Sequence, residues 1–391
     1  MPTSSSSCAT TPGVCWAIRS PLPEKEPPVR KIEDIVIYED EQFYAAFPSV
    51  VSRPDGELLV VFRRAPERRR FGAPGCTHAD PNSYLVLVRS RDLGQSWSTE
   101  PELIYAHPFG GSQDPCLIDL DDGTLLVASY AWMLLPEEGV GQAEAHSLHQ
   151  VFGWKFTFLG GYLMRSYDAG HSWEGPILPP QLEDQATCYP GLPVPAMNRG
   201  ALLQGSDGLV YWAVATAPRD KPGQTALDLL VSSTWGETWE HRGRIAADDR
   251  VVFNETSLIE TVGGDLVALV RTAGYQDHGV VVRSTDRGQS WEPWKDMGVI
   301  GHPYQALRLD DGCFLLVYGY RHEPYGIRAR LLDPGCRDFT GPELVLRDDG
   351  GSGDLGYPWA CQLADGRVLV TYYFNRGDGT RHIAGTFLEV D

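Results

Sequence analysis

The sequence predicts an all-β fold built from repeated antiparallel units, and three observations support this prediction. A short motif ending in tryptophan recurs along the chain, and a tight glycine turn recurs between apolar runs. Glycine, proline and tryptophan are also abundant, with 42 Gly, 29 Pro and 11 Trp among 391 residues. Repetition of this kind indicates an architecture in which each unit buries its apolar face against its neighbours.

The tryptophan motif reads Ser-x-Asp-x-Gly-x-Ser/Thr-Trp, and each copy follows an apolar run. Copies occupy residues 90–97, 166–173 and 284–291, and a degenerate copy at 232–239 has Thr234 in place of the aspartate. The Asp or Ser side chain can cap turn N–H groups, the glycine can take a positive φ, and the tryptophan opens the next strand with a large apolar face. The motif is therefore a hairpin signal with a structural role.

The second repeated element is an apolar strand, a tight turn and another apolar strand. These turns lie at residues 55–56, 122–123, 207–208, 263–264, 311–312 and 365–366. Each is typical of a hairpin between the first two strands of a unit. The six units begin near residues 45, 112, 192, 254, 303 and 357. Together they predict a six-bladed β-propeller of four-stranded antiparallel blades, closed so that no sheet edge is unpaired.

The ends and one insertion complete the predicted organisation. Residues 1–30 have the Ser/Pro-rich composition of a flexible leader, and 31–391 are interpreted as a single propeller domain. We expect residues 35–38 to supply the outer strand of the last blade and so close the ring. Residues 142–155 are the one candidate for a helical or lid insertion.

Composition excludes several classes of partner. Asp and Glu number 52 against 33 Lys and Arg, and the formal charge of −19 argues against nucleic acid or an anionic membrane. The sequence predicts no membrane-spanning helix, and its N-terminus has no apolar signal region, so we expect a cytoplasmic protein. Eight scattered cysteines without a C-x-x-C pair favour buried free thiols over a zinc site.

The tryptophan motif resembles the Asp box of the sialidase superfamily, and further positions are similar to the sialidase site. In those propellers the ligand lies over the central axis, in contact with residues at the starts of inner strands. Here Glu255 opens the fourth unit, Arg271 and Arg321 end strands of the fourth and fifth, and Tyr357 opens the sixth. The resemblance implies Tyr357 as nucleophile, Glu255 as its base, and the two arginines as the grip on a substrate carboxylate.

The paired residue types suit this chemistry. A phenol with a pKa of about 10 is a poor nucleophile, but a carboxylate within hydrogen-bond reach can take its proton. A neutral tyrosine also avoids the repulsion that a carboxylate nucleophile would meet at an acidic sugar. Sialidases are the tyrosine exception among glycosidases.

The first blade matches the superfamily less closely. Sialidases place a third arginine two positions before a proline, whereas this chain has Ala46 before Pro48. Arg63, Arg64 or the cluster at 68–70 are candidates to compensate. Losing a bidentate arginine contact should weaken recognition of a carboxylate.

The resemblance also implies an acid/base residue in the loop after the second strand of the first blade. Asp80 is the first candidate there and His78 the second, since either can protonate a leaving oxygen. Asp114 resembles a pocket aspartate that contacts a hydroxyl or N-acyl group. His302 and Gln305, at the start of the fifth unit, are expected to line the pocket.

The resemblance implies an exo-acting retaining glycoside hydrolase. Its substrate would be a glycan or glycoside with a terminal acidic sugar, sialic acid or a related nonulosonic acid, and the chemistry needs no metal or organic cofactor. One alternative is a propeller glycosidase or lyase for a uronic acid or deoxysugar. Another is a non-catalytic carbohydrate-binding propeller with an aromatic mouth formed by Trp132, Trp154 and Trp359.

Overall fold

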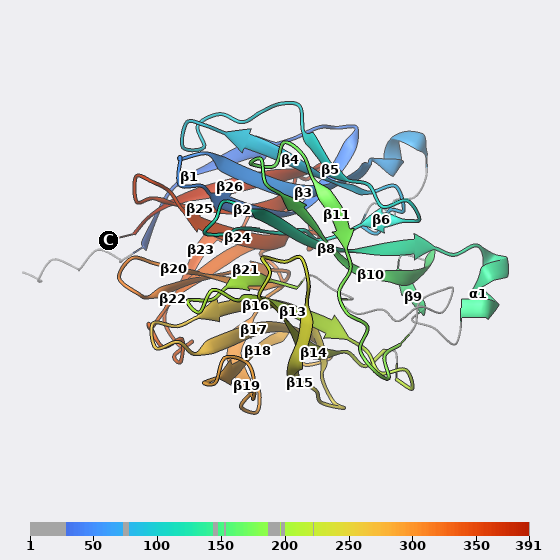
Figure 1. Ribbon diagram of the computed structural model, residues 1–391. Helices are drawn as coiled ribbons and strands as arrows, with labels where there is room; N and C mark the ends of the chain where they lie inside the picture. Colours follow the sequence, from blue (N-terminus) through green and yellow to red (C-terminus); the bar gives the residue numbers. More distant parts are fainter. Residues whose placement is uncertain are drawn as a thin grey trace, which may run out of the picture.

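The computed structural model describes residues 29–72, 78–143, 148–151, 154–186, 196, 200–221 and 223–390. These residues form six antiparallel sheets that follow one another in chain order (Figure 1). The fold is a six-bladed β-propeller, which confirms the predicted class.

The first three blades run as follows. The first contains β2 (Phe43–Ser52), β3 (Leu58–Pro66), β4 (Tyr84–Ser90) and β5 (Glu102–Tyr105). The second contains β6 (Gly111–Ser112), β7 (Cys116–Asp119), β8 (Leu125–Leu134), β10 (Trp154–Ser166) and β11 (Glu174–Ile177), with β9 (Leu148–Val151) paired to β10. The third contains β12 (Leu202–Gln204), β13 (Val210–Thr216), β14 (Ala226–Ser232) and β15 (Glu240–Ala246).

The last three blades are more regular. The fourth contains β16 (Val252–Glu260), β17 (Leu266–Ala273), β18 (His278–Ser284) and β19 (Lys295–Ile300). The fifth contains β20 (Tyr304–Arg308), β21 (Phe314–Tyr320), β22 (Gly326–Leu332) and β23 (Glu343–Arg347). The sixth contains β24 (Gly356–Gln362), β25 (Val368–Asn375), β26 (Arg381–Val390) and β1 (Val29–Tyr38).

The ring is closed by strand β1. It pairs antiparallel with β26, from Val29 opposite Val390 to Tyr38 opposite Ile383, so both ends of the described chain share one sheet. This confirms that residues 35–38 supply the outer strand of the last blade. Closure matters because an unpaired strand edge would expose backbone N–H and C=O groups.

The core lies between successive blades. Inner and second strands are almost continuously apolar because both of their faces are covered by neighbouring sheets. In β3, residues 58–62 are all buried, and Phe62 belongs to one apolar cluster with Tyr373 of the sixth blade. Burial of this kind, about 25 cal/mol per Å² of apolar surface, is the main force that holds the blades together.

The Asp boxes connect the third and fourth strands of the first four blades. In the first box, Asp92 Oδ1 accepts a hydrogen bond from Ser96 N at 2.9 Å, and Ser90 Oγ accepts one from Gly94 N at 2.9 Å. Gly94 has φ +84°, which is why the motif requires glycine there. In the degenerate box the Thr234 hydroxyl accepts from Thr238 N at 2.9 Å, so a hydroxyl replaces the missing carboxylate.

The segment around the predicted insertion differs from the expectation. A short helix, α1 (Glu137–Ala143), starts before residue 142, and β9 pairs with the start of β10 as an extension of the second blade. Residues 144–147 and 152–153 lie outside the described residues, as do most of the predicted leader and the predicted start of the third unit near 192. The inner strand of that unit, β12, begins at Leu202. No helix among the described residues is long and apolar enough to cross a membrane.

Candidate active site

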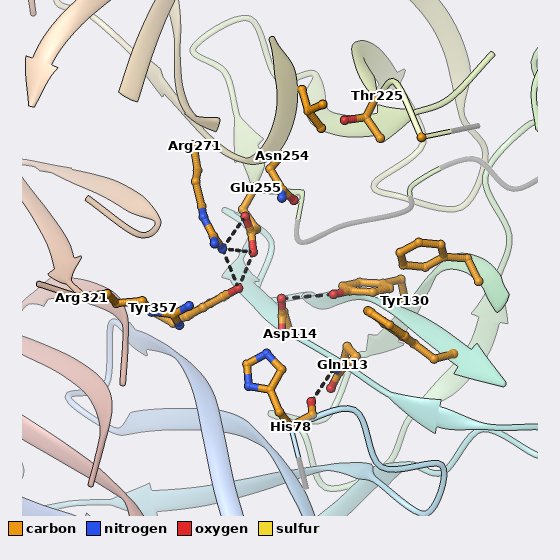
Figure 2. A pocket seen from close by; sticks show the side chains of 14 residues that line it. His78, Gln113, Asp114, Tyr130, Thr225, Asn254, Glu255, Arg271, Arg321 and Tyr357 are labelled. Carbon is orange, nitrogen blue, oxygen red and sulfur yellow. Dashed lines mark hydrogen bonds and ion pairs between the residues drawn. The ribbon is translucent and has the colours of Figure 1, made fainter. Parts of the chain in front are cut away.

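A cavity of about 320 Å³ opens at the end of the ring where the inner strands begin (Figure 2). The glycine turns and Asp boxes connect strands at the opposite end, which leaves this end to the longer loops. Side chains from five of the six blades and from the loop before β4 line the cavity: His78, Gln113, Asp114, Tyr130, Trp132, Phe158, Gly223, Thr225, Val252, Asn254, Glu255, Arg271, Arg321 and Tyr357.

Three inner strands carry a β-bulge at the same place, and these bulges position residues at the cavity. In β16 the register moves from Phe253 opposite Thr272 to Thr256 opposite Val270. Equivalent shifts occur between Ala46 and Ser49 in β2, and between Gly356 and Trp359 in β24. A bulge bends its strand and redirects side chains, which explains why Tyr357 takes φ +54° and reaches the axis.

Tyr357, Glu255 and Arg271 form one hydrogen-bonded group in the cavity (Figure 2). The Tyr357 hydroxyl donates to Glu255 Oε1. Arg271 Nη1 donates to both carboxylate oxygens of Glu255, at 2.9 and 3.1 Å, and lies 3.3 Å from the Tyr357 hydroxyl. Tyr357 is 3% exposed and Glu255 is 5% exposed, so the group is shielded from solvent.

The protonation states of the pair follow from its surroundings. Burial raises the pKa of Tyr357 well above its ordinary value, and the charges of Glu255 and Asp114 raise it further, so the phenol keeps its proton. Burial opposes ionisation of Glu255, but the charge of Arg271 and the hydrogen bond from Tyr357 outweigh it. The pKa of Glu255 is therefore lowered, and the resting pair is a neutral phenol beside a carboxylate.

Arg321 extends the cationic side of the cavity. Its Nε donates to the Leu355 carbonyl at 3.0 Å and its Nη2 to the Tyr373 hydroxyl at 3.0 Å, which hold the guanidinium 5.4 Å from the centre of the Tyr357 ring. Among the described residues, Arg271 Nη2 and Arg321 Nη1 donate to no protein atom. Both arginines line the cavity, where such N–H groups can donate to an anionic group.

The opposite wall is polar and aromatic. Asp114 lies in the break between β6 and β7, where its Oδ2 accepts from the Tyr130 hydroxyl at 3.4 Å. Trp132 and Phe158 stack beside Tyr130, with ring centroids 6.2 and 5.8 Å from it. A carboxylate next to aromatic surface suits the hydroxyl groups and apolar face of a sugar.

His78 lies at the cavity on the other side from Glu255, and Asp354 holds it there. Its Nδ1 is 3.3 Å from Asp354 Oδ1 and 3.3 Å from the Tyr44 hydroxyl. Its carbonyl accepts from Gln113 Nε2 at 2.8 Å. The carboxylate of Asp354 also accepts from the hydroxyls of Tyr44 and Tyr373, each at 3.0 Å.

Asp354 is ionised despite its partial burial. Burial raises the pKa of Asp354. The hydrogen bond and charge of His78 and the charges of Arg381 and Arg321 lower it by more, so the pKa lies well below its ordinary range. Arg381 Nη2 lies 3.0 Å from Asp354 Oδ2.

Asp80, the first candidate for the acid/base role, does not line the cavity. Its carboxylate accepts two hydrogen bonds from Arg68, at 2.6 and 2.9 Å, and a third from Asn82 N at 2.8 Å. It is 2% exposed. In this arrangement Asp80 organises its own loop.

His302 and Gln305 also lie behind the cavity wall. His302 is buried, with Nε2 3.3 Å from Asp277, and burial and the charges of Arg271 and Arg321 lower its pKa to about 4. Gln305 accepts from Ala360 N at 3.1 Å and so links the fifth blade to the sixth.

Among the residues that the structure describes, no arginine of the first blade lines the cavity to match the third arginine of the sialidase pattern. Ala46, at the sequence position of that arginine, is fully buried, and the ring of the neighbouring Phe47 packs against Tyr357. Arg63 lies below the rings of Tyr44 and Phe47 with no exposed surface. Of the other basic candidates, Arg64 pairs with Asp40, Arg68 with Asp80 and Arg69 with Glu67, and Arg70 is exposed and does not line the cavity.

Trp132, predicted as part of an aromatic mouth, lines the cavity, whereas Tyr130, Phe158, Thr225 and the positioning role of Asp354 were not predicted. The sequence did hold a signal for Tyr130. It lies near the cavity end of the second strand of its blade, as Arg271, which was predicted, does in the fourth blade. Trp359 packs against core residues, and the Trp154 side chain lies outside the described residues. Within the described ranges, no three His, Cys, Asp or Glu side chains are arranged to hold a metal ion.

Comparisons with known proteins agree with this fold. The BNR repeat-like domain family matches residues 143–370, and no curated protein matches the chain. A crystal structure of a protein of unknown function from Dyadobacter fermentans DSM 18053 is 52% identical. It covers 93% of this chain and all of its own, with a TM-score of 0.88.

Sialidases of known structure are similar in fold. The Hadza microbial sialidase Hz136 has a TM-score of 0.62 at 18% identity, covering 88% of this chain and 65% of its own. The NanB sialidase from Streptococcus pneumoniae has a TM-score of 0.63 at 13% identity, covering 91% of this chain and 70% of its own. Trypanosoma rangeli sialidase has a TM-score of 0.60 at 14% identity, covering 93% of this chain and 60% of its own. The chain belongs to the BNR repeat-like domain family and is a sialidase-like BNR-repeat propeller.

Proposed function

We propose that this protein is an exo-acting, retaining glycoside hydrolase in which Tyr357 is the nucleophile. One observation carries the proposal: a neutral, buried phenol donates to an ionised carboxylate, Glu255, inside a cavity flanked by two arginines. A cavity of about 320 Å³ is at the small end of ligand sites, roughly 300–1,000 Å³, which suits one terminal sugar residue.

The reaction proceeds in two displacements. In the first, the Tyr357 oxygen bonds to the anomeric carbon, Glu255 takes the phenol proton, and the bond to the leaving oxygen breaks as that oxygen is protonated by Asp80 or His78. In the second, water attacks the anomeric carbon as the residue that protonated the leaving oxygen takes a proton from it, the bond to Tyr357 breaks, and Glu255 returns the phenol proton to Tyr357. Two inversions give net retention of configuration.

Two arginines favour an acidic sugar. Arg271 Nη2 and Arg321 Nη1 are placed to donate to a carboxylate beside the anomeric carbon. Such charge-assisted hydrogen bonds are about twice as strong as neutral ones. A sialic acid or related nonulosonic acid carries its carboxylate on the anomeric carbon, next to the proposed nucleophile.

A second candidate substrate is a uronic acid or a neutral deoxysugar. The observation in its favour is the first blade, where Ala46 stands at the sequence position of the third sialidase arginine and no described arginine of the blade lines the cavity. Without that arginine the cavity binds a carboxylate less strongly and accepts a sugar that has none.

The first test is hydrolysis of 4-methylumbelliferyl glycosides of N-acetylneuraminic acid, deaminoneuraminic acid, glucuronic acid, rhamnose and galactose. The proposal expects release from at least one sugar, with loss of turnover in Tyr357→Phe and Glu255→Gln. Tyr167→Phe and Glu240→Gln, at exposed positions, are matched controls that should behave as the unaltered chain. Release from a uronide or rhamnoside alone would favour the second candidate.

The second test detects the covalent intermediate. A glycosyl fluoride of the sugar that is hydrolysed, with a second fluorine on the carbon next to the anomeric carbon (C3 of a nonulosonic acid, C2 of an aldose), should raise the intact mass by one fluorinated sugar residue. The label should lie on the peptide that contains Tyr357. No label on Tyr357, or inversion of the first product by NMR, would overturn the mechanism. Silence across the panel with retained sugar binding would indicate a carbohydrate-binding protein instead.

A further inference from the structure

We propose that His78, oriented by Asp354, is the general acid and base of the proposed glycosidase reaction, in place of an aspartate. This inference rests on the proposed function and assigns the proton donor of the same site. His78 would be a catalytic residue and Asp354 a positioning residue. The geometry of the cavity carries the assignment.

The position of His78 is suitable for a group that acts on the leaving oxygen. Figure 2 shows its imidazole pointing into the cavity toward Asp114 and the Tyr357 hydroxyl, on the side opposite Glu255 and Arg271. The nucleophile and the proton donor of a retaining glycosidase lie on opposite sides of the scissile bond. His78 lies across the cavity from Glu255, the proposed partner of the nucleophile, whereas Asp80 does not line the cavity.

Three contacts hold the ring. The Phe47 ring packs edge-on against it, with centroids 5.2 Å apart at 89°, and Nδ1 lies 3.3 Å from Asp354 Oδ1 and 3.3 Å from the Tyr44 hydroxyl. A fourth contact, from Gln113 Nε2 to the His78 carbonyl at 2.8 Å, holds the backbone that carries the ring. A residue that only filled space would need fewer polar partners.

The hydrogen bond to Asp354 also decides which nitrogen can transfer a proton. The Asp354 carboxylate is ionised and can only accept, so Nδ1 must carry a hydrogen. The proton exchanged with the substrate is then the one on Nε2. A carboxylate in this position fixes both the tautomer and the orientation of a catalytic histidine.

Asp80 has the wrong partners for the same role. Its two oxygens accept from Arg68 and from Asn82 N, with the Arg68 pair in a bidentate arrangement. Proton donation by Asp80 would require the loss of this ion pair and movement of the carboxylate into the cavity. His78 needs neither change.

The proton balance closes over one turnover. In the first displacement the Nε2 proton of the imidazolium passes to the leaving oxygen as its bond to the anomeric carbon breaks. In the second, Nε2 takes a proton from the attacking water as the bond between Tyr357 and the sugar breaks. The imidazolium is restored, and no further reactant is needed.

The experiment compares two aglycones of the sugar identified above, the activated 4-methylumbelliferyl glycoside and the methyl glycoside. In His78→Ala we expect kcat/KM for the methyl glycoside to fall by about 100-fold or more and that for the activated glycoside by less than about 10-fold. Azide should restore kcat of His78→Ala on the activated substrate, because azide is a nucleophile that needs no general base. His78→Gln should show the same difference between the two substrates, since its amide can donate to Asp354 but cannot act as an acid.

Further variants distinguish proton transfer by His78 from a purely structural role. In Asp354→Asn, kcat/KM should again fall more for the methyl glycoside than for the activated glycoside, but by a smaller factor than in His78→Ala. Loss of a merely structural contact would lower both kcat/KM values equally. His171→Ala, at an exposed histidine of an Asp box, should change neither. Equal losses on both aglycones in His78→Ala and His78→Gln, or a split in Asp80→Asn instead, would overturn the inference while Tyr357→Phe remained inactive. If the unaltered chain hydrolyses no glycoside, the proposed function fails and this inference fails with it.

Discussion

The rings of Phe47 and Tyr357 lie against each other, with centroids 4.6 Å apart at an angle of 60°. Both residues occupy the bulge of an inner strand, in the first and sixth blades, and both take a positive φ, +59° and +54°. Non-glycine residues adopt this conformation at an energetic cost, and such strain concentrates at functional sites. Phe47 thus gives the proposed nucleophile an apolar wall to pack against.

The first prediction concerns this wall. Phe47→Ala should lower the free energy of unfolding by about 3–5 kcal/mol, because the ring is buried among aromatic neighbours. It should also lower kcat, because Tyr357 and His78 both lose the ring that they pack against. Urea unfolding and steady-state kinetics measure the two effects. Phe47→Leu is the control, with a smaller loss of both; unchanged kcat in Phe47→Ala would show that the wall does not position the nucleophile.

The fold could be predicted because its signals are local. Each Asp box satisfies its own turn, as when Asp92 accepts from Ser96 N only four residues away, so the motif is visible in a short window. Ring closure by β1 was also predictable, because six units leave the last blade one strand short. The start of the third unit was not, since its inner strand has only three residues.

The site was predictable only where a single position carried the signal. Glu255 and Tyr357 each open an inner strand, and a resemblance can place them one at a time. The environment of Asp354 depends on Tyr44, His78 and Arg381, which come from distant parts of the chain. The choice between Asp80 and His78 depends on a pairing with Arg68 that no local pattern reveals.

The second prediction concerns the binding of a substrate carboxylate by Arg321. Arg321→Met should raise KM for an acidic sugar by about 10- to 100-fold, since a hydrogen bond to a charged group contributes about 1.5–3 kcal/mol. It should affect kcat less, because the hydrogen bonds from Tyr357 and Arg271 to Glu255 do not involve Arg321. Michaelis–Menten kinetics on an acidic and a neutral glycoside provide the measurement. An equal change in KM for both sugars would argue against a carboxylate at this position.

The third prediction concerns pH and Asp354. Its folded pKa lies below the unfolded value of about 3.9, so its ionised form stabilises the fold above that pH, and this contribution is lost as pH falls through the folded pKa. Asp354→Asn should therefore lower the free energy of unfolding by about 3 kcal/mol at pH 7. This difference in unfolding free energy between the variant and the unaltered chain should shrink below about pH 4. Thermal unfolding between pH 7 and pH 2 tests this, with exposed Asp249→Asn as control. A difference that did not change with pH would contradict the ionised assignment.

The fourth prediction restores the degenerate Asp box. In the intact boxes, hydrogen bonds from Ser172 and Ser290 lower the pKa of Asp168 and Asp286 to about 2. Thr234→Asp would place a carboxylate where the Thr234 hydroxyl now accepts from Thr238 N, so we expect a small rise in the unfolding temperature at pH 7. Because a depressed folded pKa stabilises only above the unfolded value of about 3.9, the gain should disappear as pH falls toward 2.

Asp286→Asn makes the opposite change, because it removes the carboxylate from an intact Asp box. It should lower the unfolding temperature at pH 7, and this loss should shrink as pH falls toward 2. Calorimetry of the three chains at both pH values measures the effect. Glycoside hydrolysis should be the same in all three, because the boxes lie at the end of the ring away from the cavity. A change in kcat, with the expected stability, would show that strain at one end of a blade reaches the inner strands at the other. A fall in stability for Thr234→Asp at pH 7 would mean instead that the threonine hydroxyl already satisfies this turn, and that the added charge only adds repulsion to an acidic chain.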